Sequence, residues 1–360
     1  MTAPRSEQEL EELLSRPDDA TVASLSALDG DIIVLGAGGK MGPTLARMAR
    51  RALDTAGGTH SARRVLAVSR FSNAAVASQL EQQGVELVRA DLSDPAQVRA
   101  LPRAANMIWM AGQKFGSASD PVATWTHNVV ASTYAAEHYA GSRIVCFSTG
   151  NVYGRSDVTR GGSREEDTLR PDGEYAASCI GRERVFESIA RRAHSALLLY
   201  RLFYACDLRY GVVTDLALRI RDGIPIPLST AYANVIWQGD ANRLALRALG
   251  VAANPAVALN VTGPIVSVAD IARALAERLG REPVFEESFM TKSANDDSNS
   301  SKQVAPSTEA LVANVERLEQ LLPATSLDLD VLLDWTADWI NAERPVLGKP
   351  TKYEVRDGRF

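Results

Sequence analysis

The residues with the clearest chemistry form a glycine-rich turn in the segment VLGAGGKMGPTLARM. Gly36, Gly39 and Gly42 are spaced three apart, directly after an apolar run and before a helical pattern. Glycines in this context let backbone N–H groups approach a pyrophosphate, and the helix N-terminus favours the same anion. We therefore predict that Gly36, Gly39, Lys40, Met41 and Gly42 bind the diphosphate of a dinucleotide. The alternative is a purely structural turn.

The end of the next apolar run indicates which dinucleotide is bound. An acidic residue at this place binds the ribose 2′-hydroxyl of NAD, whereas the sequence AVSRFSN has Ser69 followed by Arg70. An acid would repel a 2′-phosphate, and an arginine can pair with one. The pattern favours NADP over NAD, unless Arg70 is an ordinary surface arginine.

Further cofactor contacts are expected where the third and fourth apolar runs end. Asp91 and Leu92, in RADLSD, could border the adenine. Ala111 and Gly112, in WMAG, are small enough to let the cofactor pass close to the backbone.

A second candidate site lies in GEYAASCIGRERVFES, residues 173–188, where Tyr175 begins a helical pattern and Cys179 follows one turn later. The chain has three cysteines and four histidines, and their spacing fits neither a disulfide framework nor a metal site. Cys179 could be a small apolar residue of the interior or a nucleophile, although no histidine lies near it in the sequence. We predict no metal ion and a reducing, cytoplasmic compartment.

The elements that must position these residues follow one another regularly. Strand-like runs such as DIIVLG, RVLAVSR, ANMIWMAG, RIVCFSTG and SALLLYRLF alternate with helical segments between residues 31 and 203. Such alternation, with nearly continuous apolar strands, indicates a parallel sheet covered on both faces. Right-handed crossovers then give an α/β, doubly wound (Rossmann) fold.

The rhythm of the sequence changes after this region, which divides the chain into parts. We predict a helical N-terminal extension over residues 1–30 and a C-terminal tail over 343–360. The tail could cover the active site of its own or of a neighbouring subunit. The NAD(P)-binding domain is expected at 31–205, completed by about 232–262, with a smaller C-terminal substrate-binding part at 206–231 and 263–342.

Composition narrows the range of functions. The chain has 360 residues, is 46% hydrophobic and 23% charged, which is ordinary for a globular enzyme. A net charge of −5 and a pI of about 5.6 argue against nucleic-acid binding. No apolar run approaches the ~20 residues of a membrane span. The expected partner is a small-molecule substrate.

Several motifs together resemble a known family. The glycine turn, ADLSD, WMAG, FSTGNVYG and EYAAS…GRER occur in the order and spacing of the extended short-chain dehydrogenases/reductases. This superfamily contains NAD(P)-dependent epimerases, dehydratases and reductases, many of which act on nucleotide sugars. The resemblance runs from about Asp31 to Ile340. It implies a homodimer, formed through the helices of WTHNVVASTYAAEHYA and YAASCIGRERVFES.

The resemblance also assigns catalytic roles. In this family a Ser/Thr hydroxyl binds the reacting oxygen, a Tyr transfers the proton, and a Lys four residues later binds the nicotinamide ribose and lowers the Tyr pKa. The matching residues are Thr149, Tyr175 and Cys179, and Tyr175 would also contact the cofactor. Cys179 therefore stands where an ammonium is expected. Without that ammonium, the free energy needed to ionise the Tyr175 phenol could rise by up to about 4 kcal/mol. Arg182 lies on the same helix face but about 10 Å further along the axis.

Two departures from the family pattern bear on the substrate. Dehydratases carry an Asp-Glu pair after the Thr, where this chain has Gly150 and Asn151. Nucleotide-sugar enzymes have an arginine for the diphosphate where this chain has Ala233 and Asn234. A substrate other than a nucleoside-diphosphate sugar, such as a free sugar, a sugar acid or another polyol, is therefore expected alongside the nucleotide sugars of the family. The residues expected to contact it are Thr149, Asn151, Tyr204 and Arg209.

Three hypotheses follow from the sequence, and one of them is an active site rebuilt around Cys179 or Arg182. The other two keep the family's chemistry or abandon it. The protein is an active NADP-dependent oxidoreductase or epimerase that acts on a hydroxyl or carbonyl of a carbohydrate-like substrate. Alternatively, it is a non-catalytic NADP-binding sensor or regulatory protein that has lost the Tyr–Lys pair.

Overall fold

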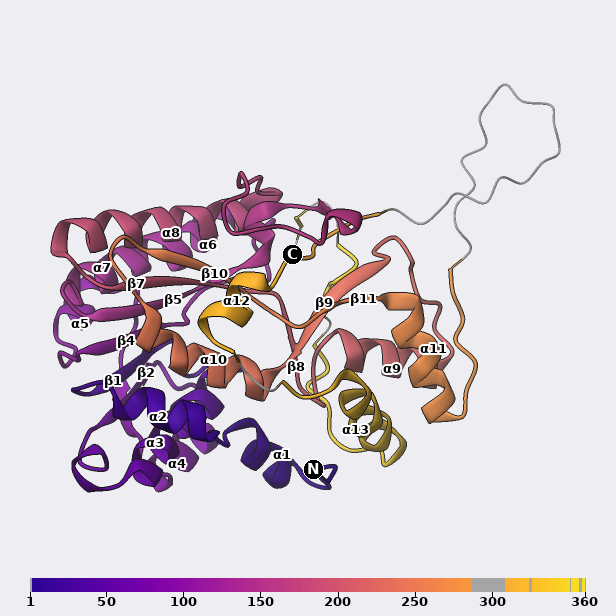
Figure 1. Ribbon diagram of the computed structural model, residues 1–360, viewed down its shortest axis with the longest axis horizontal. Coiled ribbons are helices and arrows are strands. Elements are labelled where there is room, and N and C mark those ends of the chain that lie inside the picture. Colours follow the sequence, from indigo (N-terminus) through magenta and orange to yellow (C-terminus); the bar gives the residue numbers. More distant parts are fainter. Residues whose placement is uncertain (1, 287–307, 324–325, 350, 356–357, 360) are drawn as a thin grey trace.

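A seven-stranded parallel sheet forms the centre of the larger part of the molecule (Figure 1). The computed structural model describes residues 2–286, 308–323, 326–349, 351–355 and 358–359. The sheet has the strand order β10-β7-β5-β4-β1-β2-β3, and all its neighbouring strands are parallel. The strands are β1 (Ile32–Leu35), β2 (Val65–Ser69), β3 (Glu86–Arg89), β4 (Asn106–Trp109), β5 (Arg143–Thr149), β7 (Leu197–Leu202) and β10 (Val257–Val261). The predicted doubly wound fold is confirmed.

The apolar strands bury both faces of the sheet. In β1, Ile32 and Val34 point into one hydrophobic core, whereas Ile33 and Leu35 point into the other. Since successive side chains of a strand alternate between faces, a strand covered on both sides must be apolar throughout.

Helices cover the two faces in separate layers. The core on one face includes side chains from α3 (Gly42–Ala56), α4 (Ala74–Gln82), α10 (Gln238–Val251) and α12 (Glu316–Leu321). The core on the other face includes side chains from α5 (Pro95–Arg99), α7 (Ala131–His138) and α8 (Gly173–Ala193). Ahead of α7 lie α6 (Pro121–Trp125) and a π-helical turn, η2 (Thr126–Val130). Three short 3₁₀ helices complete this part: η1 (Gly58–His60), η3 (Gly150–Tyr153) and η4 (Val158–Arg160).

The N-terminal extension consists of α1 (Glu7–Leu14) and α2 (Asp19–Ser26). The helix α2 packs against α3 and α10, and Leu25 enters the core of that layer. Leu10 and Leu14 of α1 enter the core of the smaller part instead. The extension therefore bridges the two parts of the molecule.

The smaller part is built around a three-stranded sheet with the order β11-β9-β8. Its strands are β8 (Tyr204–Cys206), β9 (Tyr232–Trp237) and β11 (Ile265–Ser267), and its helices are α9 (Val212–Asp222), α11 (Val268–Leu279) and α13 (Leu329–Asn341). The segment predicted to complete the larger domain, 232–262, is thus divided, because β9 belongs to the small sheet while α10 and β10 belong to the large one. A two-stranded ladder joins β6 (Ser156–Asp157) to β12 (Glu309–Ala310).

The C-terminal segment beyond α13 has no helix or strand among its described residues, and it crosses the smaller part toward the large one. Its backbone is fixed at several points: Leu347 N donates to Arg209 O at 3.0 Å, and Thr351 donates from N and Oγ1 to Asp215 Oδ2 at 2.8 and 2.6 Å. Tyr353 is buried in the core of the smaller part.

The described ranges lack a membrane-spanning helix and a metal-binding cluster. No helix there is long and apolar enough to cross a membrane. No group of three His, Cys, Asp or Glu side chains in those ranges is placed to hold a metal ion.

Candidate active site

A groove runs along the carboxyl ends of the central strands, where open α/β sheets bind their ligands. It consists of two adjoining cavities that share Gly36, Gly39 and the segment 110–112. The outer cavity extends over the ends of β2 and β3. The inner cavity, of about 400 Å³, reaches the end of β5 and the first turn of α8.

The glycine turn fits the predicted diphosphate site. Gly36 has a φ of +91°, and a Cβ there would lie 2.5 Å from Ala111 N. A Cβ on Gly42 would lie 2.5 Å from Ala37 O. These two glycines let the turn pack onto β4 and into α3, whereas Gly39 lies open to both cavities. The N-terminus of α3 begins at this turn, so its partial positive charge lies beside the groove.

The outer cavity contains the residues expected around the adenosine. Ser69 ends β2 and lies against the glycine turn, because a Cβ on Gly38 would come within 2.5 Å of Ser69 Oγ. Arg70 follows with its side chain exposed, and its Nη1 is 3.9 Å from an Asp91 carboxylate oxygen. Each residue predicted for the cofactor lines one of the two cavities: Gly36, Gly39, Lys40, Met41, Gly42, Ser69, Arg70, Asp91, Leu92, Ala111, Gly112 and Tyr175.

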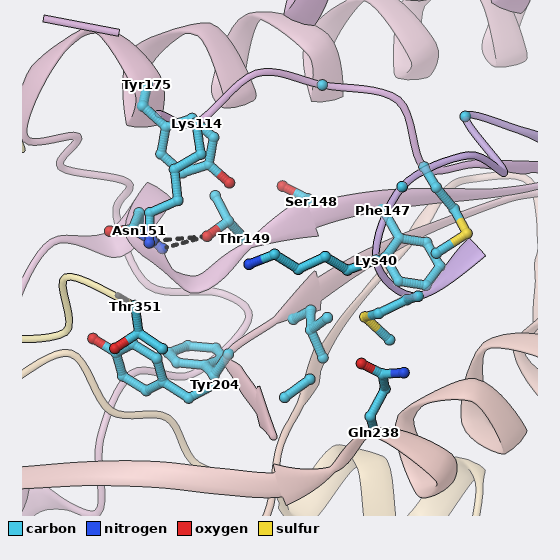
Figure 2. Close-up of a pocket in the computed structure, with 18 of the residues that line it drawn as sticks. Lys40, Lys114, Phe147, Ser148, Thr149, Asn151, Tyr175, Tyr204, Gln238 and Thr351 are labelled. Atoms are coloured by element: carbon cyan, nitrogen blue, oxygen red, sulfur yellow. Dashed lines mark hydrogen bonds between the residues drawn. The ribbon is translucent and has the colours of Figure 1, made fainter. Parts of the chain in front are cut away.

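Thr149 and Tyr175 meet in the inner cavity (Figure 2). Thr149 is the last residue of β5 and caps η3, and its Oγ1 accepts hydrogen bonds from Asn151 N at 3.2 Å and Asn151 Nδ2 at 2.9 Å. A hydroxyl has two acceptor sites and one donor. The Thr149 hydrogen is therefore left to point at the Tyr175 oxygen, and this bond lowers the pKa of Tyr175.

Burial acts in the opposite direction on the phenol. Desolvation is the largest influence on Tyr175 and raises its pKa above the usual value, and a hydrogen bond to Cys179 adds to the increase. The Arg182 guanidinium, by its charge, lowers the pKa of Tyr175. In the free protein Tyr175 is a protonated phenol, and it needs its neighbours to give up the proton.

Cys179 occupies the position that the resemblance assigns to a lysine, but it does not belong to the cavity wall. Its side chain is fully buried, and burial raises the pKa of its thiol. A buried, protonated thiol is a poor nucleophile. The prediction of a catalytic Cys179 therefore needs correction, because its side chain lines neither cavity and packs in one apolar cluster with Tyr175.

The guanidinium of Arg182 places a positive charge beside Tyr175, although the position of the family's lysine holds Cys179. Its Nη2 donates to Cys179 Sγ at 3.3 Å, its Nη1 donates to Ala111 O at 3.4 Å, and it lines the inner cavity. The expected distance of about 10 Å counted only the rise between Cα atoms, whereas long helical side chains lean toward the helix N-terminus. The absence of a side chain at Gly112 makes space for the Arg182 guanidinium, since a Cβ there would lie 2.9 Å from Arg182 Nη1.

Lys114 is a site residue that the sequence analysis missed. It follows WMAG in the loop after β4 and lines both cavities, and its Nζ lies 6.0 Å from the centroid of the Tyr175 ring. Desolvation lowers its pKa to about 8. Its place directly after a strand end that borders the cofactor groove was the available signal.

Three of the four predicted substrate residues lie at the inner cavity, namely Thr149, Asn151 and Tyr204. Arg209 does not line it. Its guanidinium pairs instead with Asp207 at 2.9 Å and Glu11 at 2.7 Å, so it ties α1 to the smaller part. This corrects the prediction that Arg209 contacts the substrate.

The positions that carry the diphosphate arginine motif in nucleotide-sugar enzymes are buried here. Ala233 lies in the core of the smaller part. Asn234 Nδ2 donates to Gly263 O at 2.8 Å, and its Oδ1 accepts from Ala313 N at 2.8 Å. These bonds hold the segment next to Leu311, which lines the cavity together with Thr351.

Known proteins resemble this chain in sequence motif and in fold. The model of the "NAD dependent epimerase/dehydratase family" matches residues 32–228, which is more than half of the chain. No curated protein sequence matches.

Solved structures with the same fold cover most of the chain. MoeE5 in complex with UDP-glucose and NAD has 21% identity and a TM-score of 0.63, covering 87% of this chain and 99% of its own. UDP-glucose 4-epimerase from Thermotoga maritima with UDP-glucose has 16% identity and a TM-score of 0.66, with coverage of 87% and 99%. UDP-glucuronic acid 4-epimerase from Bacillus cereus, with UDP-glucuronic acid and NAD, has 18% identity and a TM-score of 0.66, with coverage of 86% and 98%.

The family match confirms the resemblance found in the sequence and, with it, a nicotinamide dinucleotide as the cofactor class. The groove agrees with this, because Gly39 lies open to both cavities and the close packing at Gly36 and Gly42 has no room for a Cβ. The chain belongs to the NAD-dependent epimerase/dehydratase family.

Proposed function

We propose that this protein is an NADP-dependent oxidoreductase or epimerase that acts on a hydroxyl or carbonyl of a carbohydrate-like substrate. The observation that carries the proposal is the arrangement around Tyr175. Its phenol lies in the inner cavity, accepts a hydrogen bond from Thr149 and has the Arg182 guanidinium as a charged neighbour. The glycine turn opens onto the same cavity.

The roles of the residues follow from this geometry. The nicotinamide cofactor supplies the hydride chemistry when bound. Thr149 positions the reacting oxygen when its hydrogen turns from Tyr175 to the substrate, while two hydrogen bonds from Asn151 keep its own oxygen fixed. Tyr175 takes the hydroxyl proton in the oxidising direction and returns it in the reducing direction. Arg182 stabilises the phenolate by its charge, which replaces the missing ammonium without contacting the substrate hydroxyl itself.

NADP, rather than NAD, is proposed as the cofactor. Ser69 and Arg70 both line the outer cavity, and Ser69 takes the place of the acid that would repel a 2′-phosphate. The Arg70 side chain is 72% exposed, so its guanidinium is accessible to a phosphate.

A homodimer and a cytoplasmic location remain proposals. Exposed apolar side chains on α6 and η2, those of Val122, Trp125 and Val130, support a partner on the face that the resemblance assigns to the dimer. All three cysteines are buried free thiols, which agrees with a reducing compartment.

The test is turnover by the wild type and by Tyr175→Phe. Sugars, sugar acids and nucleotide sugars are incubated with oxidised or reduced NADP, and products are detected by nicotinamide absorbance and by NMR of the sugar. We expect wild-type turnover of at least one substrate and a loss of about 100-fold or more in Tyr175→Phe. Ser163→Ala, on a buried serine that does not line the inner cavity, serves as the control.

Two results would decide against the proposal. Full turnover by Tyr175→Phe removes the acid/base role of the phenol. Tight NADP binding by a wild type that converts no compound of the panel favours the non-catalytic NADP-binding protein, which the change at Cys179 motivates.

A further inference from the structure

The lysines in the described part of the chain lie near one another. Of the whole chain's 39 basic residues only six are lysine. Four lie in the described part of the chain: Lys40 and Lys114 line the inner cavity, and Lys349 and Lys352 lie on the C-terminal segment close enough to affect their charge. The other two fall within 287–307, outside the described residues. Most basic residues of this chain are arginines, so the lysines at the cavity stand out. An ammonium is more compact and flexible than a guanidinium.

Three of these ammonium groups surround one aromatic ring. The Nζ atoms of Lys40, Lys114 and Lys352 lie 5.6, 5.7 and 6.0 Å from the centroid of the Phe115 ring. They come from three separate segments, namely the glycine turn, the loop after β4 and the C-terminal segment. Lys40 Nζ also lies 2.9 Å from the centroid of the Tyr210 ring. The fold thus brings like charges together in a partly apolar setting.

This gathering is unfavourable in the free protein. Burial, followed by the charges of Lys349 and Lys114, lowers the pKa of Lys40 to about 8. Burial and, more weakly, the charge of Lys352 lower the pKa of Lys114 to about 8. An anion between these groups would relieve the repulsion and restore full protonation.

The carboxylates nearest the lysines offset this charge only in part. The charges of Asp207 and Asp215 raise the pKa of Lys40, and those of Cys179 and Glu354 raise the pKa of Lys114, but the net shifts remain downward. These acids have other partners. Asp207 pairs with an arginine at 2.9 Å, Asp215 accepts two hydrogen bonds from the C-terminal segment, and Glu354 lies 3.6 Å from an arginine of α9.

We propose that the inner cavity binds a substrate that carries its own carboxylate or phosphate beside the reacting hydroxyl, and that Lys40 and Lys114 hold this anion. The charge of Lys352, which acts on Lys114 from outside the cavity wall, adds to the attraction. This inference rests on the proposed function and names its substrate class. Lys40 extends from the glycine turn across the cavity toward Thr149 (Figure 2), and Lys114 lies beside the Tyr175 ring. An anion held by both is part of the reacting portion of the substrate.

The diphosphate of the cofactor is a weaker explanation for these lysines. Backbone N–H groups at the start of α3 are the usual ligands of that diphosphate. Lys40 lines the inner cavity but not the outer one, and its side chain lies over Tyr210, on the substrate side. Lys352 belongs to the segment that carries Thr351 into the inner cavity.

The test is calorimetric titration of the NADP-loaded protein with four probes: glucose, glucuronate, glucose 6-phosphate and UDP. We expect glucuronate or glucose 6-phosphate to bind at least about tenfold more tightly than glucose, as a charge-assisted contact allows. Lys40→Met, which removes a charge that lines the cavity, should abolish most of this advantage, and Lys352→Met should reduce it. Arg273→Ala, which removes an exposed charge from α11, should leave it unchanged, and Lys352→Met should keep the wild-type affinity for NADP.

Several results would overturn the anion site. These are equal binding of neutral and anionic sugars, no detectable binding of either anionic sugar, or an advantage that persists in both lysine variants. Lysine-dependent binding of UDP alone would place the anion on a nucleotide and would also overturn it. Melting temperature shows that each variant is folded, and the NADP affinity of Lys352→Met shows that its cofactor site is intact.

Because binding requires no turnover, the two proposals can fail separately. Tyr175-dependent turnover of neutral sugars alone would contradict the anion site and leave the proposed function intact. Lysine-dependent binding of an anionic sugar without any turnover would do the reverse.

Discussion

The preference for NADP can be tested by exchanging the two residues that end β2. Arg70→Ala removes the guanidinium that would pair with the 2′-phosphate, and Ser69→Asp introduces the acid that favours NAD. Both side chains line the outer cavity. Ser69 lies against Gly38 of the glycine turn, so the NAD affinity of Ser69→Asp also shows whether that turn is intact.

The magnitudes follow from exposure and charge. A hydrogen bond to a charged group contributes about 1.5–3 kcal/mol, and the Arg70 side chain is 72% exposed, so the lower end applies. Arg70→Ala should therefore weaken NADP binding about tenfold. Two unit charges 4 Å apart repel by about 4 kcal/mol at an effective dielectric of 20. Screening at this open position reduces the effect of Ser69→Asp to about 2 kcal/mol, or roughly 30-fold.

The assay is calorimetric titration of each protein with NADP and with NAD at one salt concentration. We expect the wild type to bind NADP more tightly, Arg70→Ala to lose affinity for NADP alone, and Ser69→Asp to prefer NAD. Arg99→Ala, an exposed arginine that does not line the cavity, is the matched control. Equal wild-type affinities, or equal losses for both cofactors in Arg70→Ala, would refute the reasoning.

Three further predictions concern pH, packing and assembly. The pKa values of Lys40 and Lys114 are about 8 in the free protein, and a bound anion raises them. Glucuronate affinity should therefore be highest below pH 8 and fall above it. A constant affinity from about pH 7 to about pH 9 in calorimetry would contradict this. Gly112→Ala should displace Arg182, lowering stability by about 1–2 kcal/mol and turnover with it, and an unchanged melting temperature would argue against the close packing. Val122→Lys on the exposed face of α6 should convert a dimer to monomers in light scattering, and a wild-type monomer would remove the dimer proposal.

The fold could be predicted because its determinants are local. The apolar runs of the strands and the helical patterns between them identify a parallel sheet, and the two cores on either side of β1 confirm it. The prediction was less accurate after residue 206. The runs of β9 and β10 are similar in composition, yet β9 joins the small sheet and β10 the large one. The neighbour with which a strand pairs depends on packing between distant parts of the chain, which a short stretch of sequence does not reveal.

The site was predicted best where backbone conformation determines the chemistry. The glycine turn and Thr149 lie where their motifs indicated. The contacts of the charged residues were harder to predict, because a long side chain can reach several different partners. Arg209 forms an ion pair with an acid of the N-terminal helix α1, whereas Arg182 donates a hydrogen bond to Cys179, one turn earlier on its own helix. Lys352, from the far end of the chain, has no sequence signal that connects it with the cavity.

We propose that Arg182 supplies the charge that the family takes from a lysine. A nearby opposite charge typically lowers a pKa by 1–3 units, or about 1.4–4 kcal/mol. Arg182→Met should therefore reduce turnover at neutral pH by about 10- to 1000-fold, while Arg182→Lys should retain part of it.

The most direct measurement is turnover against pH for the wild type, Arg182→Met and the double variant Cys179→Lys/Arg182→Met. The double variant restores the arrangement of the family, with an ammonium at position 179 and no guanidinium in its space. We predict that it recovers neutral-pH activity lost in Arg182→Met. Wild-type activity in Arg182→Met, or no recovery in a folded double variant that binds NADP normally, would contradict the account.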